Sequence, residues 1–124
     1  MTEKKLSFAI FGSKSGAAKS NRISELIEKL RSKNATIYVE KYFLNAIASS
    51  IDREAKRDIC AFEVIDFSVD FIISLGGDGT FLRAIGRTGS LQVPIIGVNM
   101  GRLGFLANIP QEELNLTIDN IYAN

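Results

Sequence analysis

The chain has 124 residues, with 15 lysines and arginines against 14 aspartates and glutamates, which leaves a formal charge of +1. A chain of this length can bury a core as one domain, and its charge balance contains no basic block that would indicate a nucleic-acid partner or a membrane surface. It has no histidine and a single cysteine, Cys60, which excludes an internal disulfide, Cys/His zinc sites and nucleophiles that rely on histidine. Cys60 is expected to be a small buried residue in a reducing compartment.

The first half of the chain predicts a strand, a helix and a second strand. Residues 6–11 form an apolar run that ends at Gly12. From Asn21 the apolar residues follow helical spacing, with Ser20 or Asn21 as the N-cap. The apolar stripe of this helix comprises Ile23, Leu26, Ile27 and Leu30. After a turn near residues 33–34, residues 37–39 predict the second strand, residues 41–59 give a mixed signal, and residues 62–65 weakly predict an edge strand.

The second half gives clearer patterns. Residues 71–75 are continuously apolar, as in a strand that is covered on both faces. A helix is predicted from Thr80 to Ile85, ended by Gly86, and a further buried strand at 93–98, with Pro94 near its start. A C-terminal helix begins near Pro110, and its apolar face comprises Leu114, Thr117, Ile118, Ile121 and Tyr122. Because strands alternate with helices, the sequence predicts an α/β fold with an open, mostly parallel sheet and crossover helices.

Two glycine-rich loops follow the two strands that are predicted to be buried. The first is GGDGT at 76–80, and the second is NMGRLGF at 99–105. Because ligands bind outside the carboxyl ends of the strands in open parallel sheets, both loops are expected to flank one crevice. Glycine can adopt positive φ angles and allows backbone N–H groups to approach a phosphate. A helix that begins near Thr80 adds its positive N-terminal end, so this turn predicts an anion site.

Asp78 needs a separate reason, because a carboxylate repels phosphate. It could hold a metal that bridges phosphates, accept a proton from an attacking hydroxyl, or cap the helix. Arg83, one turn further on, could reach a phosphate or lie in solvent. For Phe105, core packing is favoured by its residue type alone. The dinucleotide and phosphate-loop templates both fail, since each lacks a required glycine.

The segments GGDGTFL at 76–82 and GVNMGRLGFL at 97–106 together resemble the two N-terminal signatures of the NAD kinase family. Diacylglycerol and sphingosine kinases and 6-phosphofructokinases share a related glycine-aspartate turn, and the second segment makes the match with NAD kinases close. The resemblance implies a Rossmann-like or phosphofructokinase-like N-terminal domain. It also implies phosphorylation of the 2′-hydroxyl on the adenosine ribose of NAD to make NADP, with ATP or polyphosphate and a divalent metal such as Mg²⁺.

The same resemblance implies roles for individual residues. Asp78 corresponds to the proton acceptor, and Gly79 and Arg83 to residues associated with NAD binding. Leu103 and Phe105 would border the NAD site, which reverses the core-packing expectation for Phe105. The other nucleotide-binding positions in the two motifs are Gly76, Gly77, Thr80, Asn99 and Gly101.

The family also has an Asn-Glu motif and a β-rich C-terminal domain that complete the NAD pocket and the oligomer, a dimer or tetramer. Neither is found here, so residues 1–124 are expected to be the N-terminal nucleotide-binding domain, with little or no activity alone. The alternatives are the catalytic domain of a lipid kinase and a non-catalytic nucleotide-binding module. Because the chain has no signal-peptide pattern and no apolar stretch of membrane length, a cytoplasmic location without a membrane partner is expected.

Overall fold

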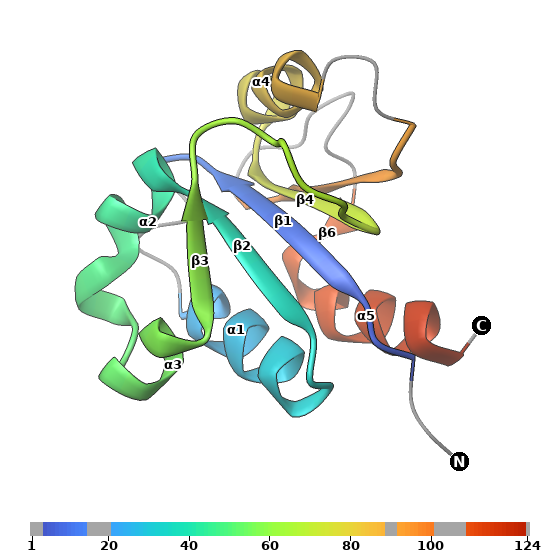
Figure 1. Ribbon diagram of the computed structural model, residues 1–124. Coiled ribbons are helices and arrows are strands. Elements are labelled where there is room, and N and C mark those ends of the chain that lie inside the picture. Colours follow the sequence, from blue (N-terminus) through green and yellow to red (C-terminus); the bar gives the residue numbers. More distant parts are fainter. Residues whose placement is uncertain (1–3, 15–20, 89–91, 101–108, 124) are drawn as a thin grey trace.

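The computed structural model describes residues 4–14, 21–88, 92–100 and 109–123, which form one sheet with helices on both sides (Figure 1). The strands are β1 (Ser7–Gly12), β2 (Thr36–Glu40), β3 (Ile59–Phe62), β4 (Phe71–Gly76), β5 (Ile95–Asn99) and β6 (Ile109–Pro110). The helices are α1 (Arg22–Ser32), α2 (Lys41–Ile47), α3 (Arg53–Arg57), α4 (Asp78–Thr88) and α5 (Leu114–Ala123), with 3₁₀ turns η2 (Ala48–Ser50) and η3 (Gln111–Glu113).

The strands lie in the order β3-β2-β1-β4-β5-β6, and every neighbouring pair is parallel. This is the strand order of the doubly wound dinucleotide-binding folds, in which the chain moves outward from the centre in one direction and then in the other. The predicted parallel α/β architecture is therefore confirmed.

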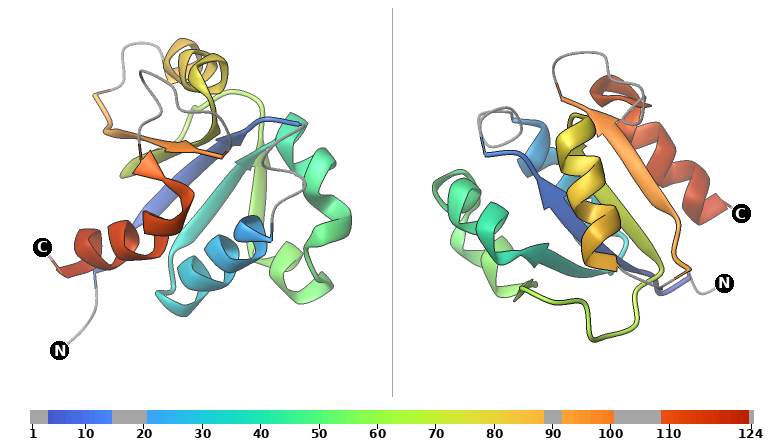
Figure 2. Two further views of the ribbon diagram at one scale, coloured as in Figure 1. Left: turned by 180° about the vertical axis from the view of Figure 1, so that it is seen from behind. Right: turned by 90° about the horizontal axis from the view of Figure 1, so that it is seen from above.

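The sheet separates two apolar clusters, because successive side chains of a strand point to opposite faces. Phe8 and Ile10 of β1 belong to the larger cluster, which lies under α1, α2, α3 and α5. Ala9 and Phe11 belong to the smaller cluster, which lies under α4 and the segment 63–70. Figure 2 shows α4 on one face of the sheet and α1 and α5 on the other. Both faces of the central strands are thus buried.

Residues 41–59, which gave a mixed signal, form α2, η2 and α3. Their buried side chains are Phe43, Ile47, Ile51 and Ala55, all of which belong to the larger cluster. Asp52 caps α3, since its carboxylate accepts a 2.8 Å hydrogen bond from the amide of Ala55. This segment therefore packs on the sheet face opposite α4.

Several predicted boundaries are wrong. The third strand lies at Ile59–Phe62 instead of 62–65, because the pairing with β2 ends at Phe62, and Val64 beyond it is 67% exposed. Helix α4 continues through Gly86 to Thr88, since Ala84 and Thr88 are buried against the sheet. That burial offsets the roughly 1 kcal/mol that a glycine costs in a helix. Strand β5 begins after Pro94, and the two-residue strand β6 was not predicted.

Cys60 is also different from the expectation, because it is exposed. It lies on β3 at the edge of the sheet, paired with Tyr38 of β2. Tyr38 stacks on Phe67 with their ring centroids 3.9 Å apart. Phe67 also packs edge-on against Phe62 of β3, with their ring centroids 5.5 Å apart, but the thiol of Cys60 remains exposed.

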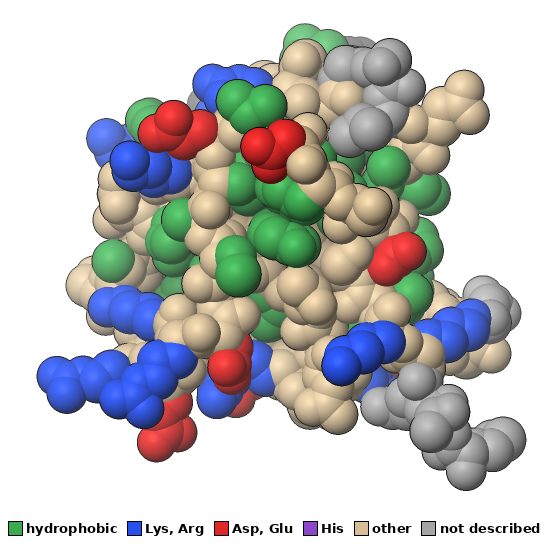
Figure 3. Space-filling view, in the orientation of Figure 1, with side chains coloured by type: hydrophobic (Ala, Val, Ile, Leu, Met, Phe, Trp, Pro, Cys, Tyr) green, Lys and Arg blue, Asp and Glu red, His purple; other side chains and the backbone are tan. Residues whose placement is uncertain are grey.

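The side of the surface seen in Figure 3 does not carry charge of one sign only. Acidic and basic side chains are interspersed there around a central group of apolar side chains. Among the described residues, no helix is long and apolar enough to cross a membrane.

Candidate functional site at the topological switch point

The crevice that the strand order predicts lies between the carboxyl ends of β1 and β4. These strands are neighbours, yet after β1 the chain continues to α1 on one face, and after β4 it continues to α4 on the other. Where the two strands end, the amide of Ser13, which follows β1, donates a 3.0 Å hydrogen bond to the carbonyl of Leu75 in β4. Such a switch point is where open parallel sheets bind ligands.

The glycine turn leads directly into α4. Gly76 ends β4, and the amide of Phe81 donates a 3.1 Å hydrogen bond to the carbonyl of Gly77. Gly77 is therefore the N-cap, and the amides of residues 78–80 have no acceptor within the helix. These amides and the helix dipole place a positive potential at the crevice. The predicted helix N-terminus at this site is confirmed, two residues earlier than expected.

The three glycines of the turn do not have the predicted backbone. None of Gly76, Gly77 and Gly79 has a φ in the left-handed region, so positive φ is not what requires glycine here. At Gly76 the reason is close packing, because an added Cβ would lie 2.5 Å from Thr80 Oγ1. At Gly77 and Gly79 an added Cβ would meet no atom of the described residues within 4 Å. With respect to that part of the chain, the space over these two residues is open.

Asp78 is the first residue of α4 and is half-buried. Since Gly77 takes the N-cap position, Asp78 is not the N-cap residue of the helix. A carboxylate in the first turn is stabilised by the positive end of the helix. Asp78 therefore lies at the switch point, beside the open space over its two glycine neighbours.

Thr80 and Arg83 lie on the sides of α4 that face the protein. The side chain of Thr80 is buried against Gly76, so only its amide is placed to face the crevice. Arg83 Nη2 donates a 2.7 Å hydrogen bond to the carbonyl of Gly12 and a 2.9 Å charged hydrogen bond to Glu40 Oε1. Its guanidinium carbon lies 5.4 Å from the ring centroid of Tyr42. Arg83 is thus held by β1, β2 and α2, and it is not a solvated cation.

The second glycine loop begins beside the first. Asn99, the last residue of β5, pairs with Gly76, and the amide of Met100 donates a 3.1 Å hydrogen bond to the carbonyl of Gly76. The two loops therefore leave the sheet at the same edge, as predicted. Gly101, Leu103 and Phe105 lie outside the described residues.

Gly12, Glu40 and Tyr42 were missed by the sequence analysis. Glu40 ends β2, with a side chain that is only 4% exposed, and Tyr42 follows it in α2. One feature of the sequence could have indicated Glu40, namely that an acid ends an apolar strand. A charge that is buried at such a position has to be paired. Nothing local identifies Arg83 as that partner.

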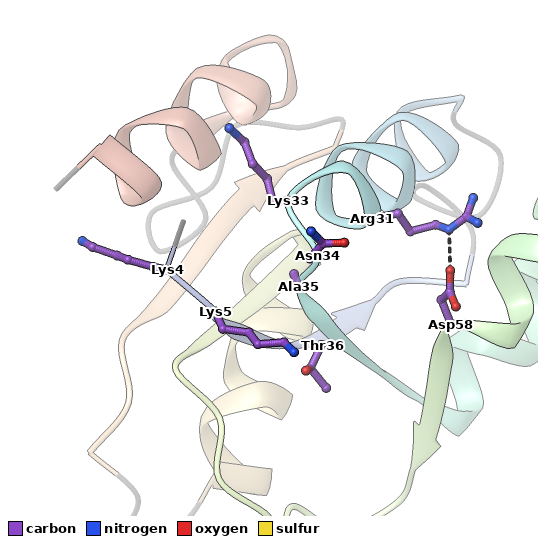
Figure 4. Close-up of a pocket in the computed structure, with 8 residues that line it drawn as sticks. All are labelled: Lys4, Lys5, Arg31, Lys33, Asn34, Ala35, Thr36 and Asp58. Carbon is purple, nitrogen blue, oxygen red and sulfur yellow. Dashed lines mark hydrogen bonds and ion pairs between the residues drawn. The ribbon is translucent and has the colours of Figure 1, made fainter. Parts of the chain in front are cut away.

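Two surface hollows lie at opposite ends of the strands. One, of about 360 Å³, is at the carboxyl ends of β2 and β3 and is lined by Glu40, Lys41, Tyr42, Asn45, Phe62, Glu63 and Arg87. The other, of about 630 Å³, is at the amino ends of the strands and is shown in Figure 4. In that hollow Arg31 is already paired with Asp58 at 2.8 Å and with Glu28 at 2.7 Å. Of these two, the smaller hollow lies nearer the switch point, since Glu40 in its lining contacts Arg83.

The described residues do not form a metal site by themselves, because no three of their His, Cys, Asp or Glu side chains gather closely enough to hold an ion. Asp78 could contribute one carboxylate to an ion whose other ligands are phosphates and water, which is how Mg²⁺ usually binds.

A doubly wound sheet with a glycine turn, a helix N-terminus and a carboxylate at its switch point defines a nucleotide-binding α/β domain. Comparison with known proteins gives the family. The family model described as the ATP-NAD kinase N-terminal domain matches residues 8–124. The chain therefore belongs to the NAD kinase family.

Individual relatives agree with this assignment. The chain is 41% identical over 119 residues to an NAD kinase of Bacteroides fragilis, covering 96% of this chain and 41% of that protein. It is 36% identical over 118 residues to an NAD kinase of Christiangramia forsetii, covering 94% of this chain and 40% of that protein. The chain thus spans about two fifths of the length of these relatives.

The fold also matches a solved structure. A yeast NADH kinase crystallised in complex with NADH superposes with a TM-score of 0.79 at 20% sequence identity, covering 96% of this chain and 36% of that chain. At this level of identity the match supports the fold. Membership of the NAD kinase family favours that class over the lipid kinases, whose resemblance to this chain is a related glycine-aspartate turn.

Proposed function

We propose that this chain is the N-terminal domain of an NAD kinase, which transfers a phosphoryl group from ATP or polyphosphate to the 2′-hydroxyl on the adenosine ribose of NAD. The proposal rests on family membership and on one structural observation. That observation is the position of Asp78 in the first turn of α4, at the switch point and beside the open space over Gly77 and Gly79.

In this proposal Asp78 accepts the proton of the attacking hydroxyl, because a carboxylate next to a weakly acidic alcohol can orient it and take its proton. The first-turn amides of α4 bind negative charge on a phosphate. Gly77 and Gly79 leave room for the nucleotide, since neither has a side chain in the open space.

Asn99 and the loop that follows would form the other wall of the site. Asn99 lies beside Gly76 at the end of β5. Gly101, Leu103 and Phe105 are proposed as NAD-binding residues on the basis of the family resemblance alone. The same holds for a homo-oligomer of the longer protein and for its cytoplasmic location.

A divalent cation would neutralise charge on the phosphates when it is bound. Asp78 is the residue of the glycine turn that could hold it, with the remaining ligands supplied by phosphates and water.

The test is Asp78→Asn in the longer protein that contains this domain. Because asparagine keeps the shape but accepts no proton, we expect kcat to fall by about 10²-fold or more, while the dissociation constant for NAD changes little. Steady-state kinetics and calorimetry with NAD measure the two quantities.

The matched control is Asp66→Asn, which makes the same change at an exposed residue of the segment 63–70. Full activity of the Asp78→Asn protein would show that Asp78 is structural, and the site would then be that of a non-catalytic nucleotide-binding module.

A further inference from the structure

A buried ion pair links α4 to the end of β2. Glu40 Oε1 lies 2.9 Å from Arg83 Nη2, and the Glu40 side chain is 4% exposed, against 32% for Arg83. The same nitrogen donates to the carbonyl of Gly12 at 2.7 Å. One guanidinium nitrogen therefore ties the carboxyl ends of β1 and β2 to the helix that begins with Asp78.

This pair differs from the other ion pairs of the described residues in its acid, because the carboxylate side chains of those pairs are 47% exposed or more. A buried carboxylate requires a partner, and Arg83 is the partner that the structure provides. The guanidinium also lies over the ring of Tyr42, which is a second contact with the protein beside that with Glu40.

The geometry leaves little of Arg83 for a phosphate. Nη2 already has two acceptors, and Nε is buried with no acceptor among the residues that the structure describes. Anions often accept two hydrogen bonds from Nε and Nη2 of one guanidinium group. A phosphate that approaches Arg83 from solvent could not bind in this way, because Nε is buried and Nη2 is occupied. In addition, the charge of Arg83 is balanced by Glu40.

We propose that Glu40 is a positioning residue: it holds Arg83 against Gly12, and through Arg83 it fixes the first turn of α4, with Asp78, at the switch point. This inference rests on the proposed kinase function. Arg83 then acts through its contacts with the protein and not as a direct ligand of NAD phosphates. Because Asp78 and Arg83 lie on the same short helix, a shift at one end displaces the other, and small displacements of reacting groups are costly in rate.

The first experiment measures steady-state kinetics of the longer protein with Glu40→Gln, Arg83→Met and the double variant. We expect each single change to lower kcat by about tenfold or more, with KM for NAD within about twofold of the wild type. We expect the double variant to be no slower than the worse single variant, because both changes break the same contact. Arg83→Lys should rescue only in part, since lysine lacks the planar fork.

The matched control is Glu63→Gln. Glu63 lines the neighbouring hollow and pairs with Lys41 at 3.4 Å, and its side chain is 71% exposed. Among the described residues, the carboxylate that pairs with Arg83 is that of Glu40. We expect this variant to keep the kcat and KM of the wild type.

Two kinetic results would overturn the proposal. If Arg83→Met raises KM for NAD while Glu40→Gln leaves both constants unchanged, Arg83 is a direct ligand. If the Glu40→Gln protein loses thermal stability but keeps its kcat per folded molecule, Glu40 is a structural residue only.

A second measurement separates this proposal from the kinase function itself. In the 124-residue chain, Glu40→Gln should speed hydrogen exchange about tenfold at the amides of residues 81–84 in α4, relative to amides of α1 in the same protein. Unchanged exchange in α4 would overturn the positioning role. If the wild-type longer protein forms no NADP, the kinase proposal fails, and the exchange result still decides whether Glu40 holds α4.

Discussion

At the scale of single residues, the glycine turn contains glycines of two kinds. Gly76 lies against α4, where a side chain would collide with Thr80 Oγ1 and come within 3.2 Å of Ser13 Cβ. Gly77 and Gly79 face open space. The first is therefore required by the fold of this domain, whereas the other two leave space that the described residues do not fill.

This distinction predicts opposite effects of the same substitution. Gly76→Ala should lower the free energy of unfolding by about 1–3 kcal/mol, because α4 or Ser13 has to move. Gly79→Ala should leave it unchanged or raise it by up to about 1 kcal/mol, since alanine favours the helix. Denaturant unfolding of the 124-residue chain measures both values.

The pair serves as its own control, because the two glycines are three residues apart and receive the same methyl group. In the longer protein, Gly79→Ala should raise KM for NAD, since the methyl group enters the space proposed for the nucleotide. Equal destabilisation by the two substitutions would contradict the assignment.

Sequence reasoning reached part of the site at this scale. Asp78 and the glycine turn were predicted because their pattern is local: strand, glycines, acid and helix follow one another within a few residues. The pairing of Glu40 with Arg83 joins residues 43 positions apart. It depends on β1 lying between β2 and β4, so no local pattern contains it.

At the scale of elements, the strands that are buried on both faces were predicted more accurately than the strands at the edges of the sheet. The segment 71–75 was predicted within one residue of β4 because its apolar residues are covered on both faces. The edge strands β3 and β6 are short, have exposed positions, and were misplaced or missed. Their positions are set by pairing with a neighbouring strand, and a single sequence does not show that pairing.

Helices α1 and α5 lie on the same face of the sheet and are joined by an ion pair. Lys29 Nζ lies 2.6 Å from Asp119 Oδ1. The hydrogen bond from Lys29 holds the pKa of the Asp119 carboxyl below its ordinary value of 3.8, against a smaller opposing effect of desolvation. Because both side chains are partly exposed, the contribution to stability is small.

This pair predicts a pH dependence with a definite sign. A carboxyl group whose pKa is lowered by folding stabilises the protein above its unfolded pKa, and the stabilisation is lost as the pH falls through the folded pKa. The melting temperature of Asp119→Asn should therefore lie below that of the wild type at neutral pH. The difference should disappear as the pH falls below 3.8.

Thermal melts of both proteins from neutral to acid pH give this difference directly. Asp66→Asn is the control, because Asp66 is exposed and not in this interface. A difference between Asp119→Asn and wild type that does not change with pH would show that the ion pair is not its source.

At the scale of the whole molecule, the core and the candidate site differ. The sheet is covered on both faces by two apolar clusters, whereas an added Cβ at Gly77 or Gly79, beside Asp78, would meet no described atom within 4 Å. The chain spans about two fifths of the NAD kinase of Bacteroides fragilis. In the proposal, the remainder of the longer protein closes the crevice, holds both substrates in line and excludes water.

The 124-residue chain should therefore fold without being an effective kinase. We expect cooperative thermal unfolding by circular dichroism, because a chain of this size buries about two thirds of its surface. We expect NADP formation at least about 10³-fold slower than by the longer protein, since neither substrate is held against the other. A cycling assay specific for NADP measures the rate, and the cooperative melt shows that low activity does not come from an unfolded sample.

Adding the remaining part of the protein as a separate chain should restore turnover, and Asp78→Asn in the first chain should abolish that restored rate. NADP formation by the 124 residues alone at the rate of the longer protein would contradict the division of the site between two domains.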